Sequence, residues 1–223
     1  VLLANKESYV AAGEYLNTLS LEKKSIVIPI DSEHCAIHQC ISSASNINGD
    51  VSEIILTGSG GPLLNIKKSE FRAITPEVAT NHPIWKMGKK ISVDSATLMN
   101  KGLELIEARW LFNVEDDRLN LVIHPEGIVH SLVEFSDKSI VAQMSVPDMK
   151  IPISYGLGFP NRVISGAKKL SLTDIGSLTF LKPNFDKFPC LTLAKEALKV
   201  GGTAPCLLNA ANEEAVNAFL ERK

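Results

Sequence analysis

The 223-residue sequence predicts an α/β protein. Its opening follows the order strand, helix, strand, which is typical of α/β architecture. Later in the chain, two apolar stretches separated by a short polar turn predict an antiparallel hairpin, so the sheet should be mixed. The chain closes on helical patterns. We therefore expect an α/β domain with a mixed sheet and a lid loop, followed by a connecting segment and the start of a helical C-terminal domain.

The first half of the chain alternates apolar runs with helical spacing. One helix is predicted to begin at Pro76, because Thr75 is a suitable N-cap and proline suits the first helical turn. The elements expected in this half are a strand end at 2–4, a helix over 7–19, a strand over 25–30, a short helix over 35–44, a strand over 52–58, the helix from Pro76, a strand over 89–94 and a long helix over 95–112.

The second half has a different character. A strand over 120–124 precedes a hairpin within 128–146, whose turn is the polar sequence SDK. Residues 159–190 are rich in proline, glycine and serine, which indicates a connecting segment. A helix over 191–200 stops at two glycines, and another helix follows Pro205.

Composition narrows the class of protein. The chain is 45% hydrophobic and 22% charged with a net charge of −2, so it lacks the basic surplus of a nucleic-acid-binding surface. No apolar run approaches the roughly 20 residues that span a bilayer. The four cysteines form no CxxC pair and are interpreted as free thiols in a reducing compartment. The first residue is not methionine and the last helical pattern has no C-cap glycine, so we expect a fragment with structure missing on both sides.

Two carboxylates follow the strand over 25–30. Asp31 or Ser32 is a candidate N-cap, with Glu33 in the first helical turn. The alternative is a metal site, because Asp31 and Glu33 would share one side of the chain if the backbone is still extended there. Paired carboxylates at the carboxyl end of a strand suit Mg²⁺ or Mn²⁺. The local sequence leaves both interpretations open.

The long helix contributes a third acid. Asn100, Lys101 and Glu104 fall within a wedge of about 100° on the helical wheel, with apolar residues on both sides. The wedge either faces solvent or is the one polar strip of a buried helix. If Glu104 met Asp31 and Glu33, each pair of charges would repel by ~4 kcal/mol at about 4 Å. Such a cluster would need a cation or would hold a proton.

Two positions are candidates for anion binding. The glycine-rich turn at 57–62 could present backbone N–H groups beside Ser59, or it could be a plain tight turn. It is not a dinucleotide fingerprint, because Leu63 occupies the third glycine position. Ser95 stands where the strand over 89–94 should give way to a helix, and helix N-termini attract phosphate. Lys101 would add positive charge.

The segment 81–90 carries His82, Trp85 and Met87 in a loop. It is either a surface loop with an anchoring tryptophan or a lid that closes over a ligand. A zinc site is a further alternative, because His34 and His38 share a helix face near Cys35 and Cys40. It is disfavoured, since no HExxH pattern and no second Cys/His cluster completes it. His124 and His130 are interpreted as core or interface histidines.

Several stretches together resemble the 1-deoxy-D-xylulose 5-phosphate reductoisomerase family. They occur in order along nearly the whole chain, which makes the combination specific. The stretches are LLANKES at 2–8, PIDSEH at 29–34, LTGSGGP at 56–62, NHPIWKMGKKISVDSATLMNKGLELIEARWLF at 81–112 and PDMKIPI at 147–153.

The resemblance implies an enzyme that converts 1-deoxy-D-xylulose 5-phosphate into 2-C-methyl-D-erythritol 4-phosphate in non-mevalonate isoprenoid biosynthesis, with NADPH and Mg²⁺ or Mn²⁺. It implies roles for matching residues. The metal ligands would be Asp31, Glu33 and Glu104, and the catalytic residues would be Lys6 and Glu33. The substrate contacts would be Lys6, Ser32, Glu33, Ser59, His82, Ser95, Asn100, Lys101 and Glu104. The NADPH contacts would be Asn5, Glu7 and Gly88, and the lid residues would be Trp85 and Met87.

The resemblance also implies a domain organisation. Residues 1–30 would be the tail of an NADPH-binding domain, 31–158 the catalytic domain, 159–190 the connecting segment and 191–223 the start of the helical domain. The family's glycine-rich nucleotide loop is not present in the sequence, so these residues by themselves should be inactive.

The family further implies a homodimer that pairs through the 128–146 hairpin, and a location in the bacterial cytoplasm or, in a eukaryote, the plastid. Another metal-dependent sugar-phosphate enzyme and a non-catalytic phosphate-binding module are the alternatives. The three acids together favour an enzyme, because a simple phosphate binder would not need them.

Overall fold

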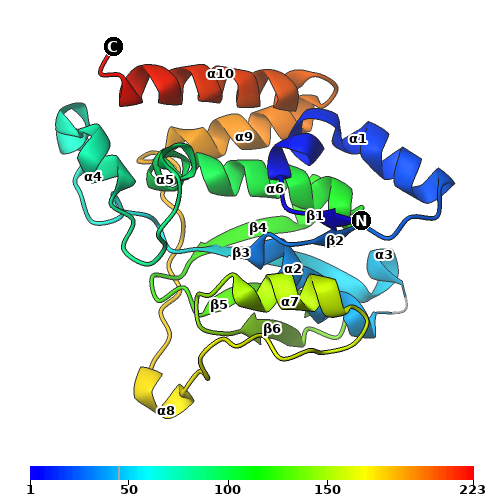
Figure 1. Ribbon diagram of the computed structural model, residues 1–223. Helices are drawn as coiled ribbons and strands as arrows, with labels where there is room; N and C mark the ends of the chain where they lie inside the picture. The colour runs from blue at the N-terminus through cyan, green and yellow to red at the C-terminus, as the bar shows by residue number, and fades with distance from the viewer. Residues whose placement is uncertain (45) are drawn as a thin grey trace.

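A four-stranded mixed sheet organises the fold (Figure 1). β3 (Val51–Gly58) pairs in parallel with β4 (Leu119–Ile123) and antiparallel with β5 (Val129–Phe135). β6 (Ile140–Met144) completes the predicted hairpin with β5 and forms the edge of the sheet. The predicted α/β class with a mixed sheet is therefore confirmed.

The structure is a computed structural model that describes residues 1–44 and 46–223. A separate two-stranded parallel sheet pairs β1 (Leu2–Leu3) with β2 (Ile28–Pro29), and α1 (Lys6–Glu22) connects them as predicted. The remaining elements are α2 (Ser32–Cys40), α3 (Ile47–Asp50), α4 (Pro76–Thr80), α5 (Lys89–Ala96), α6 (Met99–Leu111), α7 (Lys150–Gly158), α8 (Leu172–Ile175), α9 (Pro189–Val200), α10 (Ala204–Leu220) and three 3₁₀ turns at Ile41–Ser43, Lys68–Ala73 and Asp116–Arg118.

α6 is the central helix of the molecule, packed between α1, α5 and α9 on the side of the sheet that carries α10 (Figure 1). Leu105 belongs to the main core, which continues into the sheet through Ile54 and Leu121. Leu103 and Ile106 belong to a second core that joins α1 to α9. Because α6 is apolar on two sides and buried along its first ten residues, it is a buried helix, as one of the two interpretations predicted.

The predicted strand over 89–94 is wrong, because these residues form α5. The stretch buries Ser92, Val93 and Asp94 in succession, which a helix enclosed by other elements allows. The predicted long helix is also interrupted, since Leu98 adopts a left-handed conformation with φ of 59° between α5 and α6. That conformation costs roughly 1–2 kcal/mol. Leu98 is 2% exposed, and burial of such a side chain contributes about 1.5–3 kcal/mol, so packing holds the break.

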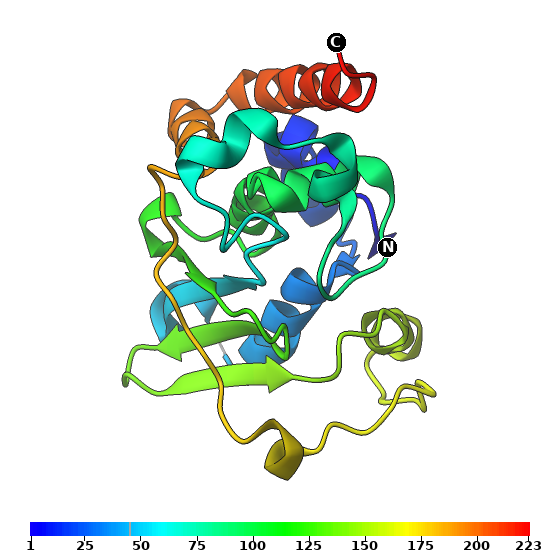
Figure 2. The same cartoon turned by 90° about the vertical axis from the view of Figure 1, so that its left-hand side faces the viewer.

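Residues 159–188 lie mostly outside regular structure and run from α7 past the sheet to α8 and back to α9 (Figure 2). An isolated bridge between Ile123 and Leu181 attaches this segment to the end of β4. α9 and α10 then form the predicted helical end of the chain. Among the described residues, no helix is long and apolar enough to cross a membrane.

Candidate metal and substrate site

A cavity of about 470 Å³ opens where α1, α2, the loop after β3, the 81–88 loop, α6 and α7 meet. Most of the predicted site residues line it. They are Lys6, Glu7, Asp31, Ser32, Glu33, Ser59, His82, Trp85, Met87, Ser95, Asn100, Lys101 and Glu104. The two remaining predictions lie outside the lining: Asn5 caps α1 by accepting from Ser8 N at 2.9 Å, and Gly88 stands at the N-terminus of α5.

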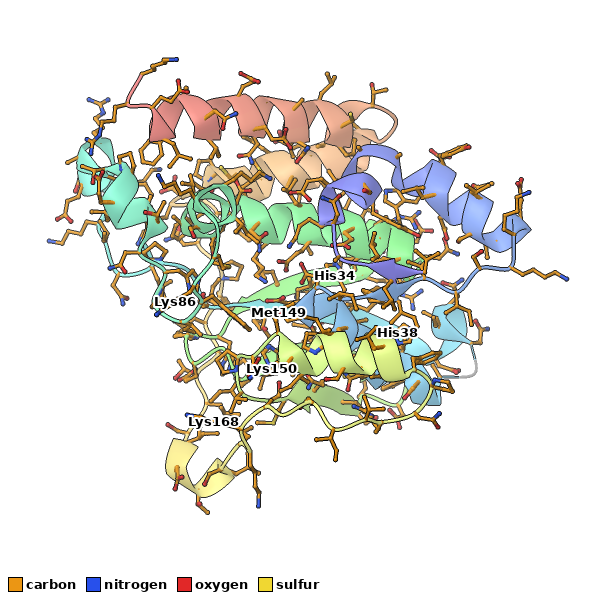
Figure 3. The ribbon with its side chains drawn as sticks, viewed as in Figure 1. His34, His38, Lys86, Met149, Lys150 and Lys168 are labelled. Carbon is orange, nitrogen blue, oxygen red and sulfur yellow. The ribbon has the colours of Figure 1, made fainter. Side chains whose placement is uncertain are left out.

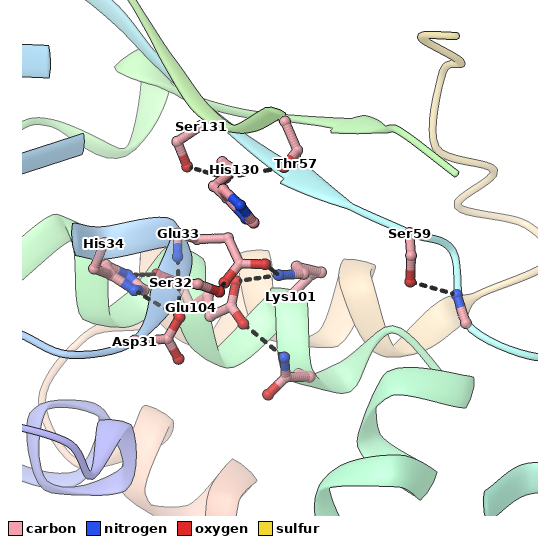
Figure 4. Close-up of polar contacts among 12 residues, drawn as sticks. Asp31, Ser32, Glu33, His34, Thr57, Ser59, Lys101, Glu104, His130 and Ser131 are labelled. Atoms are coloured by element: carbon pink, nitrogen blue, oxygen red, sulfur yellow. Dashed lines mark hydrogen bonds and ion pairs between the residues drawn. The ribbon is translucent and has the colours of Figure 1, made fainter. Parts of the chain in front are cut away.

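Asp31 confirms the N-cap interpretation, while the metal interpretation stays a prediction. It is the N-cap of α2, because Oδ1 accepts a hydrogen bond from Glu33 N at 3.3 Å. It also faces the cavity with Glu33 and Glu104, and one carboxylate oxygen of each lies within 4.8 Å of the others (Figure 4). The expectation that an extended backbone aligns Asp31 with Glu33 is wrong, since the helix begins at Ser32. The helical turn and α6 together produce the convergence.

Two buried lysines offset part of the negative charge of this acid cluster. Lys6 Nζ lies 2.6 Å from Asp31 Oδ2 and 2.8 Å from Glu104 Oε1. Lys101 Nζ lies 2.5 Å from Glu33 Oε1 and 2.6 Å from Glu104 Oε2. Glu104 is 1% exposed and therefore depends on both ammonium groups. Three converging carboxylates need a cation or a proton, and in the structure lysine side chains supply positive charge.

The pKa values follow from burial and from these charges. Burial alone would raise the pKa of Asp31, but the Lys6 ammonium lowers it well below its usual value. Burial would lower the pKa of Lys6, but Asp31 and Glu104 raise it well above its usual value. Burial, reinforced by the charge of Glu104, raises the pKa of Glu33 to about 7 even though Lys101 opposes the shift. At Glu33, therefore, the effect of burial on the pKa outweighs that of the neighbouring lysine.

Asn100 links the two parts of the cluster. Its Oδ1 accepts from Lys6 Nζ at 2.9 Å, and its Nδ2 donates to Glu104 Oε1 at 2.6 Å. On the other side, the Ser32 hydroxyl donates to Glu33 Oε2 at 2.5 Å. Each carboxylate therefore has neutral as well as charged partners, and their orientation in the cavity is defined.

Sequence reasoning missed a buried pair behind the acids, His34 and Glu107 (Figure 3 labels His34). His34 Nε2 donates to the Glu104 carbonyl oxygen at 3.0 Å, and Nδ1 lies 3.3 Å from Glu107 Oε2. Burial would lower the pKa of His34, but Glu107 and Asp31 raise it to about 9. Burial raises the pKa of Glu107 to about 7. The signal for Glu107 was its position three residues after Glu104, on the same helix face.

The disfavoured zinc alternative has no geometric support among the described residues. His38 Nδ1 lies 2.6 Å from the Tyr155 hydroxyl, whereas His34 points to Glu104 and Glu107. Gln39 donates to Cys35, and Cys40 is buried in the main core. His34 and His38 therefore contact different residues and do not converge on one site.

The glycine-rich turn after β3 brings Ser59 close to α5. Gly60 and Gly61 have φ values of 86° and 65°, and a Cβ on Gly61 would lie 2.5 Å from the Ser95 carbonyl oxygen. Glycine is therefore required for this approach. Ser95 lies in the last turn of α5, so the expectation that it begins a helix is wrong. The serine nevertheless lines the cavity.

The hydrogen bonds of His82 determine what Ser59 can offer. His82 Nδ1 accepts from Ile84 N at 3.1 Å and from Trp85 N at 3.0 Å, so in a neutral ring the proton is on Nε2. That N–H donates to Ser59 Oγ at 3.1 Å, and Gly61 N donates to the same oxygen at 3.3 Å. Burial lowers the pKa of His82, with Lys101 contributing, which favours the neutral ring. Ser59 can then donate its own proton into the cavity.

The predicted lid is one wall of the cavity. Trp85 and Met87 line it from the loop, and Met149 lines it from the start of α7 (Figure 3 labels Met149). His130 on β5 lines it as well, although it was interpreted as a core or interface histidine. Burial lowers the pKa of His130 to about 4, and its Nε2 lies 2.8 Å from Ser145 Oγ. His130 is therefore a neutral group in this wall.

Comparisons with known proteins identify what the chain is similar to. Residues 27–112 match the model of the 1-deoxy-D-xylulose 5-phosphate reductoisomerase C-terminal domain, and residues 144–223 match that of the DXP reductoisomerase C-terminal domain. The chain is 51% identical to the 1-deoxy-D-xylulose 5-phosphate reductoisomerase of Desulforamulus reducens over 99% of the chain and 56% of that protein. It is 52% identical to that of Persephonella marina over 99% of the chain and 57% of that protein.

The solved structures that the chain resembles belong to the same family as these relatives. A DOX-P reductoisomerase in complex with NADPH, fosmidomycin and magnesium matches with a TM-score of 0.95 and 46% identity over 99% of the chain and 56% of that structure. The Zymomonas mobilis 1-deoxy-D-xylulose 5-phosphate reductoisomerase in complex with NADPH matches with a TM-score of 0.92 and 44% identity over the whole chain and 57% of that structure. The chain thus spans slightly more than half the length of the proteins it matches.

Proposed function

This chain belongs to the 1-deoxy-D-xylulose 5-phosphate reductoisomerase family, and we propose that it forms the metal- and substrate-binding part of an enzyme that converts 1-deoxy-D-xylulose 5-phosphate to 2-C-methyl-D-erythritol 4-phosphate with NADPH. The observation that carries this proposal is the convergence of Asp31, Glu33 and Glu104 in a cavity that also presents hydroxyl and ammonium donors. A non-catalytic phosphate-binding module would not need that convergence.

The acid cluster fits a hard divalent cation. Its three carboxylate oxygens are close enough to share one ion, and oxygen ligands suit Mg²⁺ and Mn²⁺. Asp31, Glu33 and Glu104 would hold the metal, whose chemistry when bound is Lewis-acid polarisation of sugar oxygens. Lys6 and Lys101 occupy the positions of positive charge in the structure, so they would turn toward the substrate when the ion is present.

Different hydrogen-bond donors of the cavity would contact the two ends of the substrate. Ser59, Ser95 and Lys101 would hold the phosphate end, together with Asn100 and the neutral His82. Lys6 and Ser32 would contact the reacting end beside the metal, where Lys6 can donate a proton to an oxygen that gains negative charge. Contacts to the non-reacting phosphate position the reacting end and lower the barrier.

NADPH would supply the hydride, and the chain offers part of its binding site. Glu7 lines the cavity, Asn5 lies beside Lys6, and Gly88 begins α5 at the base of the lid. Trp85 and Met87 would close over the bound molecules and exclude water. The other nucleotide contacts would come from the part of the family's length that these residues do not span.

We assign the 128–146 hairpin to a homodimer interface. β6 is a sheet edge in the described structure, and it exposes Ile140 at 53% and Val141 at 41%. An exposed apolar edge strand is a surface that proteins usually cover. We place this enzyme in the bacterial cytoplasm or, in a eukaryote, in the plastid, as the family resemblance implies.

The proposal is tested with the complete gene product. Oxidation of NADPH should depend on 1-deoxy-D-xylulose 5-phosphate and on Mg²⁺ or Mn²⁺. Asp31→Asn and Glu104→Gln should lower this activity by orders of magnitude and weaken Mn²⁺ binding, because each removes one of three oxygen ligands. Asp117→Asn is the matched control, since that carboxylate is exposed. Absence of conversion by the unmodified protein, or unchanged Mn²⁺ binding in both variants, would refute the proposal.

A further inference from the structure

A chain of charged and polar contacts joins three elements that are distant in the sequence. Lys90 Nζ, on α5, lies 3.0 Å from Glu7 Oε1 on α1, and the two residues are 83 positions apart. The same ammonium lies 3.0 Å from Asp94 Oδ2, one turn later on α5. Asp94 Oδ1 accepts from Asn212 Nδ2 on α10 at 2.7 Å, across 118 positions. One carboxylate thus connects α5 to α10 and, through Lys90, to α1.

Asp94 is the buried centre of this chain of contacts. It is 1% exposed, and each of its oxygens has a different partner. A buried carboxylate is tolerated only when it is paired and hydrogen-bonded, so both contacts are needed to keep it there. Burial would lower the pKa of Lys90, but Asp94 and Glu7 raise it, which keeps the ammonium charged between the two acids.

Two members of this chain of contacts, Glu7 and Asp94, line the cavity beside its other groups. Glu7 follows Lys6 in the first turn of α1, and Asp94 precedes Ser95 in α5. Lys90 is in the first turn of α5, immediately after the lid loop ends. A shift of α5 along or around its axis would therefore displace Ser95 and the base of the lid relative to Lys6.

We propose that Lys90 and Asp94 are positioning residues, which hold α5 against α1 and α10 so that Ser95 and the base of the lid face Lys6. This inference rests on the proposed function for its kinetic consequence. It gives α10 a part in the geometry of the site, because Asn212 secures the oxygen of Asp94 that Lys90 does not reach.

The test compares Lys90→Met with Lys89→Met in the complete gene product. Both lysines begin α5, but Lys89 is exposed and has no ion pair among the described residues. Lys90→Met should lower kcat/KM by about tenfold to about 100-fold, the range expected when catalytic groups are misplaced by a change outside the chemistry. KM for the sugar phosphate should rise because Ser95 is displaced. Lys90→Arg should restore most of the activity, and Lys89→Met should behave like the unmodified protein.

A second variant approaches the same centre from the other side. Asn212→Ala removes the donor to Asp94 and should raise KM in the same direction, whereas Asn217→Ala, at an exposed position of the same helix, should not. Hydrogen exchange is the readout that does not depend on activity: amides of residues 84–96 should exchange faster in Lys90→Met and Asn212→Ala than in the two controls.

The outcomes separate this inference from the proposed function. If the unmodified protein does not convert the sugar phosphate, the proposed function is wrong, and hydrogen exchange still tests whether Lys90 and Asn212 hold α5. If the unmodified protein is active while Lys90→Met lowers only the melting temperature, with kcat/KM and exchange of 84–96 unchanged, the positioning role is wrong.

Discussion

Lys6 and Asp31 form an ion pair of 2.6 Å between the first turn of α1 and the N-cap of α2. The Lys6 side chain is 8% exposed and that of Asp31 16%. The ammonium group therefore lies against a carboxylate that we assign to the metal. A cation bound at the proposed site would compete with Lys6 for the same negative charge, and this competition would have a measurable consequence.

Lys6→Met should separate metal binding from turnover. Without the ammonium, the acid cluster carries more negative charge, so Mn²⁺ should bind at least as tightly as in the unmodified protein. Activity should fall by about 10²–10⁴-fold if Lys6 acts in proton transfer. Electron paramagnetic resonance titration of Mn²⁺ and steady-state kinetics measure the two effects, with Lys24→Met as the exposed control. Weaker Mn²⁺ binding in Lys6→Met would contradict the competition.

Metal binding should depend on pH through Glu33. Its pKa in the folded protein is raised to about 7, chiefly by burial. Below that pH Glu33 is protonated, and a metal ligand must be deprotonated. Mn²⁺ affinity should therefore increase as the pH rises from about 6 to about 8 and then level off.

The matched variant for this prediction is Glu33→Gln, which cannot titrate. It should bind Mn²⁺ weakly and lose the step near neutral pH. Glu107→Gln controls for the other acid whose pKa is raised to about 7. A pH-independent Mn²⁺ affinity across this window in the unmodified protein would show that Glu33 is not a ligand whose protonation opposes the metal.

Trp85→Ala should impair turnover and leave the fold almost unchanged. Trp85 lines the cavity from the loop that we propose as a lid, so its packing partner is expected to be the bound ligand. The melting temperature without ligand should stay within a few degrees of that of the unmodified protein. Trp110→Ala is the contrasting variant, because Trp110 packs on the core between α1 and α6 and lies against Gly13. A large loss of stability in Trp85→Ala would make it an ordinary packing residue.

Residues 1–223 on their own should bind Mn²⁺ measurably and a sugar-phosphate analogue weakly, but not NADPH. The residues proposed for the metal and the phosphate all lie between Asp31 and Glu104, whereas Asn5, Glu7 and Gly88 offer few contacts for a dinucleotide. Calorimetric titration of the folded polypeptide with each ligand measures this difference. Tight NADPH binding would reveal a cofactor site within these residues that has not been recognised.

Local patterns accounted for much of the fold. The hairpin of β5 and β6, the helix α1 and the polar strip of α6 follow from residue spacing, because each depends on neighbours within one or two turns. Residue spacing gave the wrong prediction at 89–94, where a segment with strand-like residues forms a helix. It also failed at Leu98, because the energy that supports the left-handed residue comes from burial among other elements.

The sequence by itself determined which side chains were available for chemistry and the order in which they occur. The tertiary structure decided which of them meet. Lys6 reaches Glu104 across 98 positions, and Lys90 reaches Glu7 across 83. The raised pKa of Glu33 and the buried contact of His34 with Glu107 likewise arise only when distant segments remove water from the same place. Charge pairing and burial act through space, and spacing along one helix or strand does not contain that information.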